Sequence, residues 1–127
     1  MAGPAEIVEQ YFSAWTSQDF EKARSLLHAD LSFKGPIETL DSADALIESI
    51  RGLAQIVTGA ERRGLLQEGD QVVLIYDLHT VPIPTAPVAE CYTVRGGKIA
   101  AVQAFFDARP FAAMFEQQQA YTDPDRH

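Results

Sequence analysis

An acid and an imidazole stand two residues apart in one apolar stretch of the chain. Asp77 and His79 fall within residues 71–80, QVVLIYDLHT, whose composition predicts a β-strand. Because side chains alternate along a strand, both would project from the same face, with Cα atoms about 6–7 Å apart. If that face is enclosed, His79 could act as a general base while Asp77 fixes its tautomer and keeps it basic.

The alternation of this strand leaves the orientation of the pair open. One face carries Val72, Leu74, Tyr76 and Leu78, and the other carries Val73, Ile75, Asp77 and His79. If the first face looks into the core, the acid and the imidazole are solvated polar groups and carry no chemistry. Periodicity alone does not separate these two readings.

The sequence carries no recognisable signature of a bound cofactor or metal. It has no glycine-rich phosphate loop and no G-x-S-x-G motif, and its histidines at 28, 79 and 127 lack the spacing of metal ligands. A net charge of -8 argues against nucleic-acid and membrane partners, because contacts to phosphate need clustered Lys and Arg. We therefore expect a pocket that works without a cofactor or a metal.

Length and composition predict one domain over residues 1–127, with residues 108–127 as a C-terminal tail that could form a short helix over 109–119. No stretch approaches the roughly 20 apolar residues that span a bilayer, and the N-terminus does not look like a signal peptide. A single cysteine, Cys91, excludes an internal disulfide and fits a reducing compartment. We expect a cytoplasmic protein.

Two amphipathic helical patterns come first in the chain. Apolar side chains recur at helical spacing in residues 6–16, after a proline at position 4 that suits a first helical turn. Asp19 can cap a second helix over residues 20–27. A third helix is expected from residue 43, after Ser42, with an apolar stripe of its own.

The rest of the chain has the period of strands. Strands are predicted over residues 31–34, 55–67, 71–80, 88–94 and 98–106, with turns at 68–70 and 95–97 and a stiff proline loop at 81–87. Helices followed by an antiparallel meander predict an α+β fold with the helices on one face of a curved sheet. Both faces of the strands are apolar, so a second copy of the chain is expected to cover the outer face.

The first third of the sequence carries a resemblance to a known family. Y-F-S-A-W-T-S-Q-D-F followed by S-L-L-H-A-D-L-S-F resembles the first helices of the SnoaL-like branch of the nuclear transport factor 2-like (NTF2-like) superfamily, and the order of elements agrees over residues 7–106. That branch includes ketosteroid isomerases, polyketide cyclases and limonene epoxide hydrolases. The resemblance implies a cone-shaped, strongly curved mixed or antiparallel sheet wrapped around the N-terminal helices, enclosing a pocket, and a homodimer through the outer sheet face.

The same resemblance implies roles for individual residues. It places Tyr11 at the tyrosine of the isomerases' oxyanion hole, and Glu90, in V-A-E-C-Y-T-V, at the partner acid, which burial keeps protonated. It also places Asp77 among residues that line the pocket. The isomerases' general base falls on Gly35, which cannot take a proton, so a ketosteroid isomerase is not expected unless His79 or Asp77 substitutes.

The expected pocket combines these groups with apolar walls. We predict Tyr11, Asp77, His79 and Glu90 as catalytic residues, although Tyr11 could equally be a core aromatic. The predicted walls are Trp15, Val73, Ile75, Tyr92, Val102 and Phe106. The leading hypothesis is a cofactor-free isomerase, cyclase or hydrolase acting on a small apolar molecule; the alternatives are a non-catalytic ligand-binding domain and a dimeric interaction domain of the same fold.

Overall fold

The structure is a computed structural model that describes residues 2–81 and 83–111. Up to residue 106, the described part of the chain forms three helices and six strands. In order they are α1 (Pro4–Thr16), α2 (Phe20–Ser25), β1 (Leu27–Lys34), β2 (Thr39–Leu40), α3 (Ala43–Ala54), β3 (Val57–Glu68), β4 (Gln71–Thr80), β5 (Ala86–Arg95) and β6 (Lys98–Phe106).

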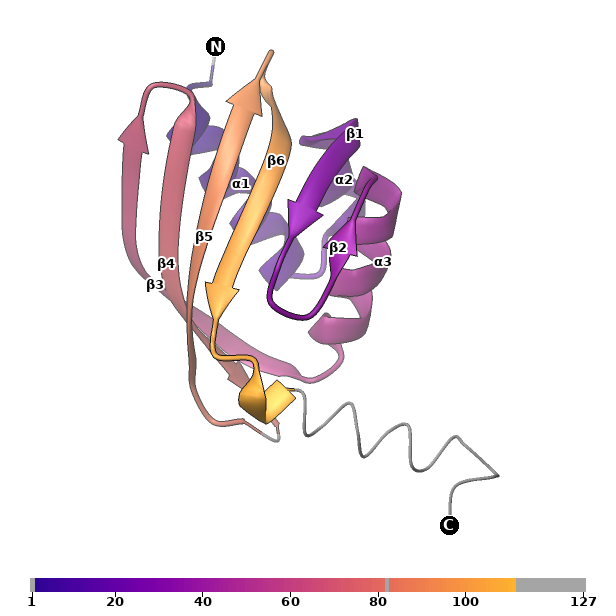
Figure 1. The fold of residues 1–127 in the computed structure, drawn as a ribbon, viewed down its shortest axis with the longest axis vertical. Coiled ribbons are helices and arrows are strands. Elements are labelled where there is room, and N and C mark those ends of the chain that lie inside the picture. The colour runs from indigo at the N-terminus through magenta and orange to yellow at the C-terminus, as the bar shows by residue number, and fades with distance from the viewer. Residues whose placement is uncertain (1, 82, 112–127) are drawn as a thin grey trace.

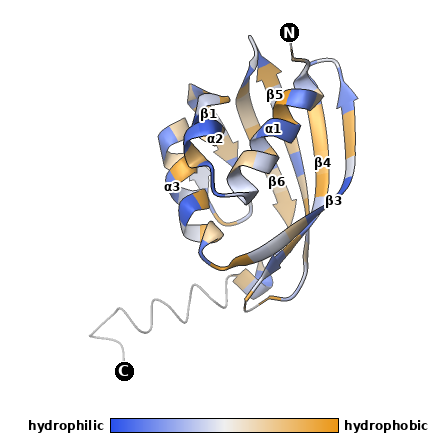
Figure 2. Cartoon of the chain, turned by 180° about the vertical axis from the view of Figure 1, so that it is seen from behind, coloured by the Kyte–Doolittle hydropathy of each residue, from blue (hydrophilic) through white to orange (hydrophobic). Residues whose placement is uncertain are grey.

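The six strands form one curved, open sheet in the order β2-β1-β6-β5-β4-β3 (Figure 1). All neighbouring pairs are antiparallel except β1 and β6, which run parallel. The helices lie against one face of the sheet, as the view from behind shows (Figure 2). The predicted α+β fold is therefore confirmed, with a mixed sheet that curves without closing.

The corner between the first two helices is encoded locally. Pro4 opens α1, and the Asp19 side chain accepts a hydrogen bond from the Lys22 amide at 3.2 Å, which caps α2 as predicted. Between them Gln18 adopts a φ of 66°, a left-handed conformation that ends α1 sharply. This corner turns the chain back so that β1 can enter the sheet.

Two details of this region differ from the prediction. The second helix ends at Ser25 and β1 begins at Leu27, so His28 lies on a strand and its Nε2 is 2.6 Å from the Arg95 carbonyl oxygen. The two-residue strand β2 falls in a segment that the sequence predicts as a loop. In both places the assignment depends on pairing with another strand, and the spacing of apolar residues does not predict such pairing.

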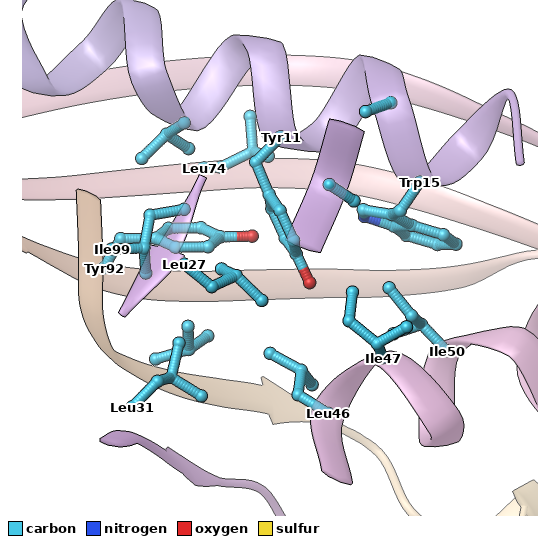
Figure 3. Packing of buried hydrophobic residues seen from close by; sticks show 14 of the residues in the cluster. Tyr11, Trp15, Leu27, Leu31, Leu46, Ile47, Ile50, Leu74, Tyr92 and Ile99 are labelled. Atoms are coloured by element: carbon cyan, nitrogen blue, oxygen red, sulfur yellow. The ribbon is translucent and has the colours of Figure 1, made fainter. Parts of the chain in front are cut away.

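The core lies between α1, α3 and the inner face of the sheet (Figure 3). The apolar stripe of α1 is buried along its length, and Tyr11 and Trp15 are each only 3% exposed. The largest fully buried side chains come from every layer: Val8, Leu27, Leu31, Val72, Leu74, Tyr92 and Ile99. Burial of this stripe, more than helix propensity, holds α1 in place.

The phase of β4 is opposite to the one that the predicted site requires. Val72, Leu74, Tyr76 and Leu78 face the helices and are at most 4% exposed, whereas Val73, Ile75, Asp77 and His79 face outward. Burying the outward set would have taken an acid and an imidazole out of water, while the inward set contains no ionisable group except a tyrosine. Solvation of two polar side chains therefore sets the phase.

Within the described residues, no helix is long and apolar enough to cross a membrane. The predicted tail helix over 109–119 lies mostly outside the described residues. Its first part is described as far as Phe111, which is buried and packs edge-on against Phe106, with ring centroids 5.4 Å apart. This contact adds an aromatic wall below the end of β6.

Candidate functional site

A cavity of about 540 Å³ lies between the helices and the inner face of the sheet. Its volume falls within the roughly 300–1,000 Å³ of typical small-molecule sites. Apolar and aromatic side chains form most of its lining, which comes from α1, α3, the segment after β1, and β4, β5 and β6. The arrangement suits a small molecule with a largely apolar body.

The cavity brings together five of the ten residues that the sequence predicts for the site. Tyr11, Trp15, Glu90, Val102 and Phe106 all line it. Tyr92 does not line it; its ring is fully buried behind the cavity wall, and its hydroxyl donates a hydrogen bond of 2.8 Å to Glu90 Oε1. The catalytic roles assigned to Tyr11 and Glu90 stay predictions.

The prediction was wrong about where the other four site residues lie. Val73, Ile75, Asp77 and His79 lie on the outer face of β4 and none lines the cavity. Asp77 accepts a hydrogen bond of 2.6 Å from Arg63, and His79 Nδ1 lies 2.7 Å from the Pro84 carbonyl oxygen while its Nε2 lies 3.2 Å from Glu61. These contacts join β4 to β3 and to the loop before β5, so the pair is structural.

Glu90 lines the cavity together with the buried Tyr11 and Tyr76, and the part that these three residues line is called its inner end here. Protein surrounds its carboxyl except on the cavity side, and this burial raises the pKa of Glu90 above the ordinary 4.5. The hydroxyls of Tyr92 and Tyr76 interact with the carboxyl and oppose the rise only in part. Burial therefore shifts the equilibrium of Glu90 towards the protonated acid, the form that can donate a hydrogen bond into the cavity.

Tyr11 presents a second donor; its ring reaches from α1 into the core, with its hydroxyl on the side of Ile47 and Leu46 (Figure 3). Burial, and then the nearby Glu90 carboxyl, raises the pKa of Tyr11, so its hydroxyl keeps its proton. This hydroxyl has no hydrogen-bond partner among the residues that the structure describes. Every described side-chain polar atom that is closed off from solvent does have a partner. We infer that the Tyr11 hydroxyl is not closed off and opens to the cavity that its side chain lines.

Tyr76 belongs to the same cluster, and the prediction missed it. It lines the cavity from β4, where its ring packs against Phe12 with centroids 4.8 Å apart, and burial followed by the effect of Glu90 raises its pKa. The alternation of β4 contains the signal that would have found it. If the face without charges is taken as the inner one, Tyr76 is the prominent polar side chain on that face. The inner end thus holds one carboxyl among three tyrosines.

The cavity offers no evident general base. A Cβ placed on Gly35 would come within 3.1 Å of the Phe33 ring, so that ring occupies the space where a base would project. The remaining carboxylates of the described lining, Glu38 and Glu48, are exposed and lie where the cavity meets solvent. Across the described residues no group of three potential metal ligands occurs. The geometry provides hydrogen-bond donors for an oxygen, the acid half of an acid-base site.

Replacing His79 with alanine tests its corrected position. We expect the His79→Ala variant to bind any cavity ligand as the wild type does, because the imidazole contacts Glu61 and Pro84 on the far side of the sheet. Since these hydrogen bonds raise the pKa of His79, their contribution to stability should be present at low pH and fade as the pH rises through that pKa. Urea unfolding at several pH values, together with ligand titration, checks both points; a loss of binding would return His79 to the site.

Comparison with known proteins agrees with this architecture. The sequence matches the SnoaL-like domain family over residues 8–102. A solved structure from Kribbella flavida is 29% identical and superposes with a TM-score of 0.83, covering 91% of this chain and 95% of that one. No match to a curated protein was found.

Two more distant structures share the fold. An NTF2-like protein of unknown function from Cytophaga hutchinsonii is 20% identical, with a TM-score of 0.78 over 88% of this chain and 96% of that one. A protein from Sinorhizobium meliloti, provisionally assigned as a polyketide cyclase, is 17% identical, with a TM-score of 0.72 over 78% of this chain and 93% of that one. The chain belongs to the SnoaL-like domain family, which confirms the resemblance seen in the sequence, and it shares its fold with NTF2-like proteins.

Proposed function

We propose that this protein binds a small, largely apolar molecule in the cavity and holds one of its oxygen atoms with hydrogen bonds from Tyr11 and Glu90. The observation that carries the proposal is Tyr11, whose side chain lines the cavity and whose hydroxyl has no partner among the described residues. Because this hydroxyl opens to the cavity, solvent can reach it in the free protein. A ligand oxygen would take the place of solvent as its acceptor.

The test uses Trp15, which lines the cavity and is the only tryptophan of the chain. Titration with a panel of bicyclic and tricyclic ketones, such as adamantanone and decalone, should change its fluorescence saturably. Native mass spectrometry of the purified protein should show any ligand carried over from the expression host. If no ketone of the panel produces a saturable change and no ligand is carried over, the proposal fails.

A second candidate is catalysis by the same two donors without a cofactor. Donors preorganised around a carbonyl oxygen stabilise the negative charge that develops there when a base removes a neighbouring proton; hydroxide or a buffer base entering the cavity would take that proton. The Sinorhizobium meliloti protein provisionally assigned as a polyketide cyclase has the same fold, which supports this candidate. Exchange of the protons next to the carbonyl of decalone for deuterium, followed by NMR, separates the two: exchange faster than in buffer indicates catalysis, and binding without it indicates a ligand-binding domain.

We also propose a homodimer through the outer face of the sheet. There an outer apolar patch spans four neighbouring strands, because Leu66, Val73 and Cys91 align in one row and Ile75, Ala89 and Phe105 in the next. Leu66, Ile75 and Phe105 are 66%, 40% and 52% exposed. Charges of both signs border it, Arg63 and Asp77 among them. In a dimer with a twofold axis, positive groups of one copy can therefore lie opposite negative groups of the other.

The Phe105→Asp variant should be monomeric at concentrations where the wild type is dimeric. Its carboxylate would be buried without a partner in the outer apolar patch, at the β6 end of the row that also contains Ile75 and Ala89. The matched control is Val81→Asp, which places the same charge on a side chain that is 75% exposed in the loop after β4. Light scattering after size-exclusion chromatography measures both; a monomeric wild type, or a dimeric Phe105→Asp variant, contradicts this interface.

A further inference from the structure

The ionisable groups that line the cavity are all carboxyls. Glu38 and Glu48 are exposed and carry negative charge, Glu90 is the buried acid described above, and the described lining contains no Lys, Arg or His. The whole chain carries a net charge of -8. A ligand with a carboxylate or phosphate group would therefore meet an unfavourable potential and no compensating cation.

The cations of neighbouring elements are engaged elsewhere. Arg51 of α3 lies over the Phe20 ring, 4.8 Å from its centroid, and Arg24 of α2 pairs with Asp44 at 2.8 Å. Arg109, after β6, pairs with Asp107 at 2.7 Å. Lys34 is at the end of β1 and aligns with Gln103 on the outer face of the sheet. None of these groups neutralises the cavity carboxyls.

Glu38 is held in position at the mouth by two elements. Its backbone carbonyl accepts a hydrogen bond of 2.9 Å from the Gly35 amide, which closes the turn after β1. Its side-chain Oε1 accepts a hydrogen bond from the Ser49 hydroxyl of α3. Both Glu38 and Ser49 line the cavity, so this carboxylate bridges the two sides of its opening. Glu48, the neighbour of Ser49, is exposed beside it.

The two ends of the cavity are therefore complementary to different chemical groups on a ligand. The inner end, at Tyr11 and Glu90, offers hydrogen-bond donors and suits an oxygen acceptor. The mouth, at Glu38 and Glu48, offers negative charge and suits a cation. Between them the wall is apolar and aromatic.

We propose that the ligand is an apolar ring compound that carries an amine, rather than an acid, at the end that faces the mouth. This rests on the proposed function, since it names the class of molecule that the same cavity takes. Glu38 is then the residue that determines specificity, and Glu48 adds to its effect. A single favourable contact between charges about 4 Å apart in water changes affinity roughly fivefold.

The experiment compares three molecules of similar size and the same apolar cage, whose polar group is cationic, neutral or anionic. Adamantylmethylamine, adamantylmethanol and adamantane carboxylate are titrated against the wild type at low salt, with Trp15 fluorescence as the readout. We expect the amine to bind about fivefold more tightly than the alcohol, and the carboxylate to bind more weakly than the alcohol by a similar factor. High salt should compress the series, because both mouth carboxylates are exposed.

A charge-only substitution locates the effect. In Glu38→Gln the amide oxygen can still accept the hydrogen bond from Ser49, so the mouth keeps its shape and loses one charge. The preference for the amine over the alcohol should fall about threefold or more in this variant. Glu68→Gln, at the exposed β3-β4 turn and outside the cavity lining, removes the same charge and should leave the series unchanged.

The outcomes distinguish this proposal from the one on which it rests. If none of the three molecules binds, and the ketones do not bind either, the proposed function itself is contradicted. If the alcohol binds but the amine is no tighter, or the carboxylate is the tightest, only the amine proposal is overturned. If Glu90→Gln abolishes the preference and Glu38→Gln does not, the cation binds at the inner end and the assignment to the mouth is wrong.

Discussion

The Tyr11→Phe variant should bind a ring ketone roughly three- to tenfold more weakly than the wild type and should unfold at nearly the same urea concentration. The hydroxyl has no partner among the described residues in the free protein, so removing it breaks no hydrogen bond of the fold. With a ligand bound, the same hydroxyl donates to the ligand oxygen, and its loss appears in the affinity. If the site is catalytic, deuterium exchange should fall about 100-fold or more, as when an oxyanion donor is removed.

Tyr92→Phe is the matched control for this prediction. It removes the same atom from a ring 6.1 Å away, but that hydroxyl donates to Glu90 Oε1. Its loss should lower the free energy of unfolding by about 1–3 kcal/mol, because a buried carboxyl loses a partner. Urea unfolding and Trp15 titration of the two variants should therefore show opposite patterns. Equal destabilisation of both variants would mean that the Tyr11 hydroxyl has a partner and is structural.

The Glu90→Gln variant should become progressively more stable, relative to the wild type, as the pH rises. Burial raises the pKa of Glu90 in the folded protein above the ordinary 4.5, so the unfolded chain loses this proton first. Wild-type stability from this group is complete below about pH 4.5 and is lost as the pH rises through the folded pKa. Each unit of difference between the two pKa values corresponds to about 1.4 kcal/mol.

Urea unfolding of both proteins from pH 4 to 8 gives the difference directly, and the pH at which it levels off reports the folded pKa of Glu90. Glutamine keeps an oxygen that can accept from Tyr92, so the comparison isolates the proton. Glu68→Gln corrects for the change in net charge. If the Glu90→Gln variant instead becomes less stable than the wild type as the pH rises, Glu90 is ionised and paired in the fold. It then cannot be the donor that the proposed function requires.

The element order could be predicted because short-range signals dominate it. Asp19 and Ser42 cap the helices that they were expected to cap, and Gly69 and Gly96 adopt positive φ in the expected turns. The parallel pairing of β1 with β6 and the short strand β2 depend on contacts between distant segments. A single sequence contains no local signal for either.

The candidate site was predicted only in part because the choice of face for one strand was wrong. Tyr11 and Trp15 lie on a helical stripe with one possible orientation, and both line the cavity. Either face of the strand over residues 71–80 could have been the inner one. The resemblance to the isomerases favoured the face with Asp77 and His79, which is the costlier one to remove from water. Counting charges would have chosen correctly, since Asp77 and His79 make the outer face costly to bury. Such a count would also have drawn attention to Tyr76.

The position of β6 has a consequence for how the chain reaches this structure. This strand lies between β1 and β5, so the last strand of the sheet joins the first third of the chain to the β3-β4-β5 meander (Figure 1). A nascent chain that has not yet produced residues 98–106 can form the meander, but it leaves β1 without its parallel neighbour. Because such pairings close long loops late, the cavity should appear in a slow final step of folding, after most of the hairpins have formed.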